Sequence, residues 1–200
     1  MEVENQMARE KEKDVPSKVD GLVDTFSLRR FLDMEDWMKT ICAALAVVVI
    51  VFGFLFHTVQ VQGRSMQPTL HDKDRLLVSS MFYTPENGDI VVVRQPGYDH
   101  PLIKRVIATE GQTVSIDFNQ HKVYVDGEEL YEPYISGPIR DQGIYPFEYP
   151  VTVPEGCIFV LGDNRNNSSD SRYFGFAKVD HIIGKALFRF LPFSDFGGVD

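Results

Sequence analysis

The 200-residue chain has few of the features that define several common kinds of protein. Its two cysteines, Cys42 and Cys157, lie in separate regions and cannot form a disulfide framework or a metal knuckle, so we expect two buried, unreactive thiols. The net charge is −9, which disfavours both a nucleic-acid-binding patch and a polybasic lipid-binding segment. None of the five histidines has metal-like spacing to another, so no metal site is expected.

One uncharged apolar segment, residues 41–56, stands out in the first third of the chain. Thr40 and residues 57–61 extend it to roughly 20 residues, which is enough to cross a hydrocarbon core of about 30 Å. A segment that is apolar on all faces and flanked by polar tails fits a bilayer better than a protein core. A cleaved signal peptide would be shorter and nearer the N-terminus. The sequence therefore predicts a retained transmembrane signal-anchor helix at residues 40–60.

The residues before this helix are predicted to form a tail, residues 1–39. Residues 1–24 are rich in Glu, Lys and Asp and are expected to be mostly disordered, whereas residues 25–39 have the composition of a short amphipathic helix at a membrane surface. Basic residues flank the apolar segment almost equally, so the positive-inside rule does not decide its orientation. A short tail and a long following domain are compatible with a cytoplasmic N-terminus and an extracytoplasmic C-terminal domain.

After the apolar segment, the hydrophobic pattern changes to the two-residue period of β-strands. Turn residues such as Asn87-Gly88 and Asp126-Gly127 separate the strands, and no helical periodicity is evident after residue 62. Residues 131–150 are rich in Pro and Gly, which indicates a long loop. We predict a mainly β domain over residues 61–200, built as an antiparallel sheet or barrel. The predicted strands are 75–80, 89–94, 102–109, 113–118, 122–126, 157–162 and 182–190.

The first segment that can carry chemistry is residues 63–70, Gly-Arg-Ser-Met-Gln-Pro-Thr-Leu. A serine after Gly-x in a tight turn can expose its hydroxyl and point its own N–H into the same space. Acyl transfer needs both, as nucleophile and as oxyanion donor. Because serines beside Gly and Pro are usually only turn formers, this segment alone makes Ser65 a candidate and no more.

The second segment is residues 101–108, where Lys104 and Arg105 interrupt a strand that is otherwise apolar on both faces. Because side chains alternate along a strand, we expect one cation to point to solvent and the other into the apolar side. Burial can lower the pKa of a lysine from about 10.4 by roughly 3–5 units, and a neutral amine can accept the proton of a serine. We predict that Lys104 points inward; two solvated cations, or a cation paired with a carboxylate, are the alternatives.

The third segment, residues 161–172, follows an apolar strand and is dense in hydrogen-bonding groups. It does not fit a calcium-binding EF loop, because Arg165 and Phe174 take the third and twelfth positions counted from Asp163. The glycine spacing of a phosphate-binding loop is also missing. We expect a rigid loop held by Asp–Arg pairs and Asx turns, serving either as a structural corner or as a support that orients a catalytic group.

Taken together, these segments resemble the type I signal peptidases, a family of Ser/Lys-dyad peptidases (bacterial type, peptidase S26). The resemblance covers roughly residues 40–190. It implies a membrane-bound serine endopeptidase of the plasma membrane that needs no cofactor. It would cut secretory preproteins after a small-x-small site to remove their signal peptides. The matching motifs are Ser-Met-x-Pro-Thr at 65–69, Gly-Asp-Ile-Val at 88–91, Lys-Arg-Val-Ile at 104–107 and Gly-Asp-Asn-Arg-x-x-Ser-x-Asp-Ser-Arg at 162–172.

The resemblance also implies a role for individual residues. Ser65 would attack the scissile carbonyl, and Lys104 would be the general base and later the acid for the leaving amine. The Ser65 N–H would be one oxyanion donor. Many relatives supply a second donor from a serine hydroxyl two positions earlier, where this chain has Gly63, so a backbone N–H or a water must substitute. The supporting residues would be Ser168, which orients the lysine, and Asp163, Asp170 and Arg172, which brace the site.

The substrate-binding surface is expected from the same positions. A small-x-small site needs shallow apolar pockets beside an exposed strand edge, where the substrate adds as a β-strand. Five residues would line these pockets by position, and each could equally belong to the core: Val61, Met66, Leu70, Leu76 and Ile103.

Three other functions stay open from the sequence. A peptidase of the same chemistry could act on a narrow set of precursors. An anchored β-domain without activity could bind exposed strands, although the presence of Ser65, Lys104 and Ser168 argues against it. A membrane-tethered binding module could use residues 163–172 as its ligand site.

Overall fold

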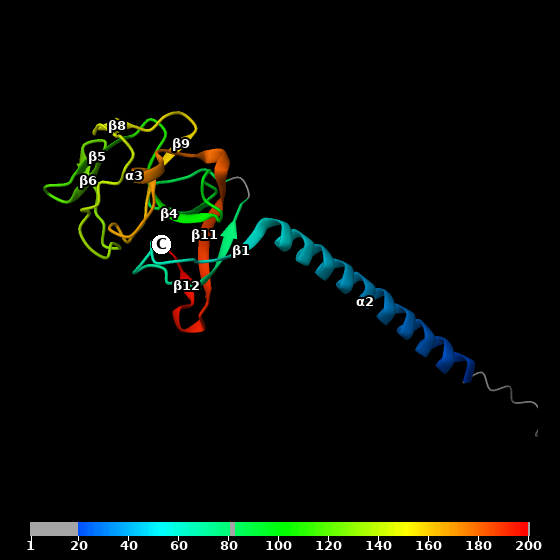
Figure 1. The fold of residues 1–200 in the computed structure, drawn as a ribbon. Coiled ribbons are helices and arrows are strands. Elements are labelled where there is room, and N and C mark those ends of the chain that lie inside the picture. The colour runs from blue at the N-terminus through cyan, green and yellow to red at the C-terminus, as the bar shows by residue number, and fades with distance from the viewer. Residues whose placement is uncertain (1–19, 81–82, 200) are drawn as a thin grey trace, which may run out of the picture. The chain divides into compact units, whose positions relative to one another are not determined.

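The computed structural model describes residues 20–80 and 83–199 (Figure 1). Contacts divide the chain into two units, Met1–Val51 and Phe52–Asp200. Most of the predicted disordered tail, residues 1–19, lies outside the described residues.

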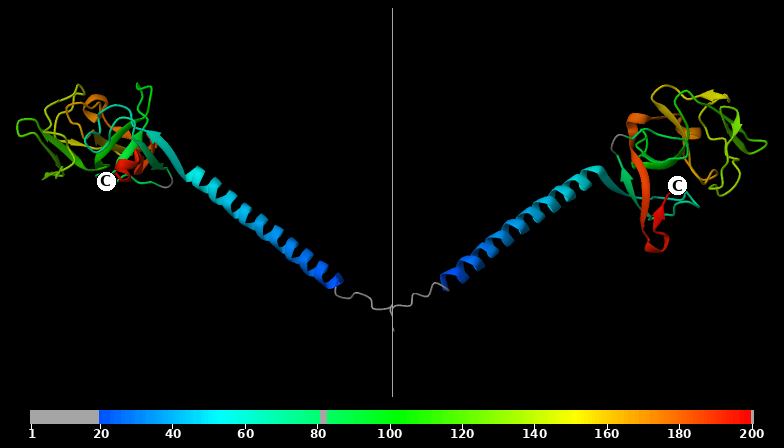
Figure 2. Two further views of the ribbon diagram at one scale, coloured as in Figure 1. Left: turned by 90° about the horizontal axis from the view of Figure 1, so that it is seen from below. Right: turned by 180° about the vertical axis from the view of Figure 1, so that it is seen from behind.

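The first unit consists mainly of one helix, α2 (Asp20–Leu55), which Figure 2 shows as a single continuous element. Its segment Asp36–Gly53 has a mean hydropathy of 1.8 and makes α2 the one helix in the described part of the chain that is long and apolar enough to cross a membrane. Residues 20–24, predicted to be disordered, and residues 25–39, predicted to form a separate amphipathic helix, are part of α2. The prediction of a buried thiol is wrong for Cys42, which is exposed on this helix, whereas Cys157 is half-buried.

The helix ends earlier than predicted, because residues 56–60 form a strand. Strand β1 (Phe56–Gln60) pairs antiparallel with β2 (Arg75–Ser79), from Phe56 opposite Ser79 to Gln60 opposite Arg75. Thr58 and Val59 are β-branched, and Val59 packs against the core of the domain. Pairing with β2 satisfies backbone groups that the predicted helix would have bonded internally, so the helix predicted to end at residue 60 ends at Leu55.

The main sheet of the second unit confirms the predicted antiparallel β class. Its strands run in the order β1-β2-β11-β3-β4-β9-β10, with β12 paired to β11, and all these pairs are antiparallel. The central strands β3 and β4 are buried along nearly their whole length, which explains their continuous apolar sequences. The remaining bounds are β3 (Ile90–Val93), β4 (Leu102–Thr109), β9 (Cys157–Leu161), β10 (Ala177–Lys178), β11 (Ile182–Leu191) and β12 (Gly197–Gly198).

A smaller antiparallel sheet packs against the main one through a shared apolar cluster that includes Ile107, Phe159, Val114 and Val123. In Figure 1 its strands β5 and β6 lie on the side of the domain away from β11 and β12. The sequence missed the two-residue strands and the short helix α3 (Ser171–Phe174), which are too short to show a period. The strand order is β7 (Glu128–Glu129), β6 (Lys122–Val125), β5 (Thr113–Asp117) and β8 (Val151–Thr152). Two 3-10 turns, η1 (Val179–His181) and η2 (Phe193–Asp195), flank β11.

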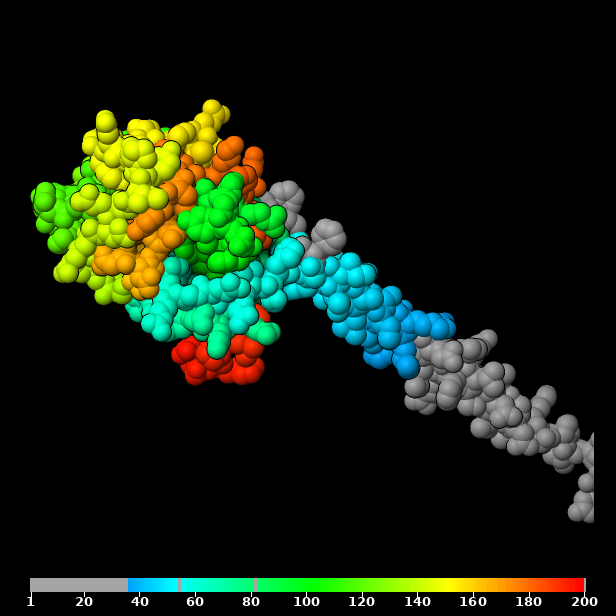
Figure 3. All heavy atoms as spheres, in the orientation of Figure 1, coloured from blue at the N-terminus to red at the C-terminus, as the bar shows by residue number. Residues whose placement is uncertain are grey.

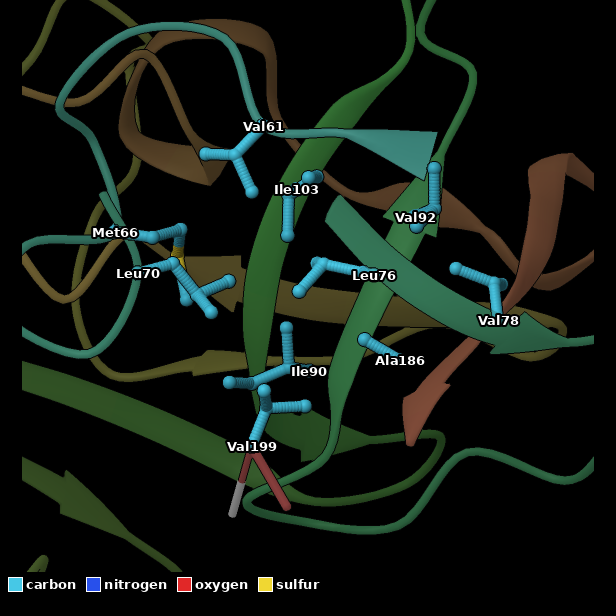
Figure 4. Packing of buried hydrophobic residues seen from close by; sticks show 10 residues of the cluster. All are labelled: Val61, Met66, Leu70, Leu76, Val78, Ile90, Val92, Ile103, Ala186 and Val199. Atoms are coloured by element: carbon cyan, nitrogen blue, oxygen red, sulfur yellow. The ribbon is translucent and has the colours of Figure 1, made fainter. Parts of the chain in front are cut away.

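A second apolar cluster lies under the segment that follows β1. Figure 4 shows side chains from this segment, from β2, from β3 and from β4 pointing toward one another. Val61, Met66 and Leu70 are each at most 3% exposed. Their burial fixes the backbone between them, which carries Ser65.

Candidate active site

The segment Val61–Asp74, which we call the nucleophile loop, is held at both ends and in the middle. Val61 N–H donates to Asp74 O at 2.8 Å, and Lys73 N–H donates back to Val61 O at 2.9 Å. Gly63 has a φ of 84°, a backbone conformation that glycine adopts without the strain a side chain would cause. Ser65 is thereby presented between two buried anchors, Val61 and Met66.

The structure brings Ser65 and Lys104 together, although they are 39 positions apart in the sequence. Lys104 Nζ lies 2.8 Å from Ser65 Oγ and also donates to Ile103 O at 2.8 Å. The lysine is 2% exposed, and this burial lowers its pKa to about 8, although the carboxylates of Asp170 and Asp163 act in the opposite direction. An amine with this pKa is partly neutral near pH 8 and can accept the proton of a serine hydroxyl.

We predicted that one of the two cations would point to solvent, but Arg105, like Lys104, is buried. It is 3% exposed, because β4 is covered on both of its faces. Its Nε and Nη2 donate to Oδ1 and Oδ2 of Asp163, both at 2.9 Å, and Nη1 donates to Gly88 O at 2.8 Å. The guanidinium also lies 3.9 Å from the centre of the Tyr134 ring. The buried arginine is therefore paired with a carboxylate, which is one of the alternatives that the sequence left open.

Residues 162–172, which we call the support loop, contain one of the predicted internal ion pairs, Asp170–Arg172, whereas Asp163 and Arg165 pair with residues outside the loop. Asp170 accepts from Nε and Nη2 of Arg172, both at 2.8 Å, and its Oδ2 also accepts from Gly162 N–H at 3.0 Å. Asp163 accepts from Thr69 Oγ1 and so links this loop to the nucleophile loop. Figure 3 shows the support loop (orange) beside residues 131–150 (yellow) and the nucleophile loop (cyan) on one face of the domain.

Several buried polar partners were not foreseen from the sequence. Arg165 pairs with Glu132 and donates to Gly162 O, and Arg105 and Thr69 both bind Asp163. The sequence could have predicted a buried counter-ion for Arg105, because a charged residue in a strand that is apolar on both faces needs one. The identity of that counter-ion, 58 positions later in the chain, could not be inferred from spacing.

Ser168 is 7% exposed and lines the same groove as Lys104, but its Oγ has no hydrogen-bond partner among the described residues. The implied hydrogen bond between Ser168 and Lys104 is therefore not formed here. Gly162 packs so closely that a Cβ at this position would overlap the Ser168 side chain and the Ser65 carbonyl. Glycine is thus required for the approach of the two loops.

The oxyanion-donor geometry differs at the two expected positions. Within the described part of the chain, the Ser65 N–H makes no hydrogen bond, so it is available to a substrate. The Gly63 N–H is occupied, because it donates to Asp72 Oδ1 at 2.8 Å. Gly63 therefore supplies neither a side-chain donor nor a free backbone donor.

A groove of about 460 Å³ opens above the Ser65–Lys104 pair. The five predicted pocket residues Val61, Met66, Leu70, Leu76 and Ile103 do not line this groove; all are buried in the core cluster of Figure 4. Alternation along β4 explains the difference at one position, since Leu102 and Lys104 face the groove while Ile103 faces the core. The lining residues include Arg64, Tyr98, His100, Leu102, Asp141 and Tyr173.

Among residues 20–80 and 83–199, no three His, Cys, Asp or Glu side chains gather as metal ligands.

Known proteins of one family match most of the chain. The family described as "Signal peptidase, peptidase S26" matches residues 34–191. A probable signal peptidase I-1 of Synechocystis sp. is 42% identical over 176 residues, which cover 82% of this chain and 86% of the relative. The signal peptidase I of Bacillus amyloliquefaciens is 37% identical over 169 residues, covering 80% and 86%. A solved signal peptidase I of Enterococcus faecalis V583 aligns with a TM-score of 0.44 at 33% identity, covering 52% of this chain and 97% of that one. The chain belongs to the signal peptidase family, peptidase S26, and is a serine endopeptidase.

Proposed function

We propose that this chain removes signal peptides from secretory preproteins, with Ser65 as nucleophile and Lys104 as general base. The observation that carries the assignment is the 2.8 Å contact between Lys104 Nζ and Ser65 Oγ, made by a buried amine whose pKa is lowered to about 8. The relatives named signal peptidase I support the substrate class.

The proposed reaction uses the pair twice. Neutral Lys104 takes the hydroxyl proton as Ser65 Oγ bonds to the scissile carbonyl carbon. The resulting ammonium returns the proton to the leaving amine as the C–N bond breaks, leaving an ester on Ser65. A water then attacks this ester, gives its proton to Lys104, and the serine leaves with that proton. The free Ser65 N–H would stabilise the oxyanion formed in both steps.

The surrounding residues would keep the amine in place. A lysine ammonium has three donors, and two are used by Ser65 Oγ and Ile103 O, so Ser168 Oγ, which lines the same groove and has no partner in the described residues, would take the third. Asp170 with Arg172, and Asp163 with Arg105, would support this arrangement as neutralised pairs.

The substrate would bind in the groove as an extended strand and be cut after a small-x-small site. The pockets for the small side chains would be formed by groove residues such as Leu102. We further propose that α2 anchors the chain in the plasma membrane, with the N-terminus cytoplasmic and the β-domain extracytoplasmic, so that substrates arrive after translocation.

The test is cleavage in detergent of a preprotein with a small-x-small site. Wild type is expected to cut after that site, and Ser65→Ala and Lys104→Ala to remain folded but inactive. Lys122→Ala, an exposed lysine on the smaller sheet, is the matched control and should cut as wild type does. Cleavage by Lys104→Ala would place the base elsewhere, and a wild type that cuts no preprotein would favour a binding function.

A further inference from the structure

The backbone around Ser65 is held from outside the groove by two hydrogen bonds from Asn164. Its side-chain Nδ2 donates to Arg64 O at 3.2 Å, and its backbone N–H donates to Ser65 O at 3.0 Å. A third bond, from Gln67 N–H to Arg64 O at 3.2 Å, closes the turn. Both carbonyls that flank Ser65 are therefore fixed, and two of the three bonds come from one asparagine.

The direction of a carbonyl determines the direction of the N–H in the same peptide unit. The Arg64–Ser65 bond is trans, and in a planar trans unit the C=O and the N–H point in opposite directions. Holding Arg64 O toward Asn164 thus turns the Ser65 N–H away from the support loop. That N–H has no hydrogen-bond partner among the described residues.

This orientation matters more here than in a site with two donors from the same loop. Gly63 has no side-chain donor, and its N–H is already bonded to Asp72. The Ser65 N–H is then a donor that this loop can offer to a developing oxyanion. Rotation of one peptide unit would remove it without moving the Ser65 hydroxyl.

We propose that Asn164 is a positioning residue that orients the Ser65 N–H as an oxyanion donor. The inference rests on the proposed function, since it assumes acyl transfer at Ser65. Asn164 does not line the groove, so it acts through the nucleophile loop rather than on the substrate. Its own rotamer is supported by Ser136, whose Oγ donates to Asn164 Oδ1 at 3.4 Å.

Two variants separate the side-chain clamp from the fold. Asn164→Asp keeps the size and the acceptor for Ser136 but loses the Nδ2–H donor, and Asn164→Ala loses both without adding charge. Neither changes the backbone bond from Asn164 N–H to Ser65 O. The matched controls are Asn119→Asp and Asn119→Ala, at an exposed turn between β5 and β6 whose side chain makes no hydrogen bond in the described structure.

The readout compares two inhibitors built on one small-x-small peptide, one ending in an aldehyde and the other in the corresponding alcohol. Ser65 Oγ adds to the aldehyde carbon, and the serine proton passes through Lys104 to the former carbonyl oxygen, which gives a hemiacetal with that oxygen in the oxyanion position. The alcohol binds without forming a bond. We expect both Asn164 variants to weaken aldehyde binding and plateau kcat by about ten- to a hundred-fold, with unchanged alcohol binding and an unchanged pH midpoint.

Each outcome has a distinct meaning. Equal losses of affinity for the aldehyde and the alcohol, or no loss for either inhibitor, would contradict the proposed role of Asn164. A loss of aldehyde affinity confined to Asn164→Asp would also contradict it, because that result would indicate a charge effect on Lys104. If wild type binds the aldehyde no tighter than the alcohol, the proposed acyl-transfer function itself fails.

Discussion

The two faces of strand β4 bury neighbouring cations with different partners. Lys104 and Arg105 are both at most 3% exposed, but Arg105 has a two-point ion pair with Asp163, whereas Lys104 Nζ hydrogen-bonds, within the described part of the chain, to Ser65 Oγ and Ile103 O. For Arg105, the counter-ion offsets the free-energy cost of burying a charge. For Lys104, that cost is largely uncompensated and lowers the pKa of the amine. A buried charge is therefore structural or chemically active according to its partner rather than its depth.

Replacing Lys104 should separate activity from stability most sharply. We expect Lys104→Met to reduce cleavage by about 10³-fold or more. Because the lowered pKa means that the folded state binds this proton less tightly than the unfolded state, burial of the lysine costs stability at pH 7, and the variant should not unfold at a lower temperature. Activity assays and thermal melts check both parts. A large drop in Tm would show that Lys104 is structural, like its neighbour.

Replacing Arg105 should have the opposite profile. Arg105→Met leaves Asp163 buried without its counter-ion, so we expect the free energy of unfolding to fall by about 3–5 kcal/mol. Denaturant titration measures this loss. The double variant with Asp163→Asn is the matched control and should recover part of it; equal stability of wild type and Arg105→Met would remove the contrast between the two faces.

A larger side chain at Gly162 should lower activity while Lys104 and Arg105 stay unchanged. In Gly162→Ala the new methyl group overlaps Ser168 and the Ser65 carbonyl, so the loops must move apart. We expect cleavage to fall by about a hundred-fold, because small displacements of reacting groups have effects of this size. Kinetics together with a circular dichroism spectrum test this, and wild-type activity would mean that the close approach is not needed.

The pH profile gives the smallest effect and the most direct test of the Lys104 face. The base must be neutral, so kcat/KM should rise about tenfold per pH unit at low pH and level off above the pKa of about 8. A plateau that begins only near pH 10 would show that Lys104 has an ordinary pKa and would weaken the comparison.

Much of the β-domain could be predicted because its strands carry a clear two-residue period. The predicted strand 102–109 coincides with β4, and the strands predicted from residue 113 and from residue 122 each end one residue early, as β5 and β6. Strand β1 was missed because Phe56 and Val59 continue the apolar composition of the preceding helix. Hydropathy describes composition, whereas the change from helix to strand depends on pairing with β2.

The site was predictable in part for the same reason. The motifs name Ser65 and Lys104, but their contact depends on core packing that joins the nucleophile loop to β4. The burial of Lys104 was predicted, but the pairing of Arg105 with Asp163 was not, because Asp163 comes from a different strand end and the fold places it beside Arg105. The sequence does not reveal which apolar side chains line a groove and which face the core, where the structure places Val61, Met66 and Ile103.

The lowered pKa of Lys104 also gives the molecule a chemical handle. At pH 8 about half of the Lys104 side chains would be neutral, whereas roughly one in three hundred would be for a lysine that titrates near 10.5. Small amine-directed reagents that enter the groove should therefore acylate Lys104 ahead of the exposed lysines. Peptide mapping after brief treatment would find this modification, and filling the groove with a peptide should protect against it.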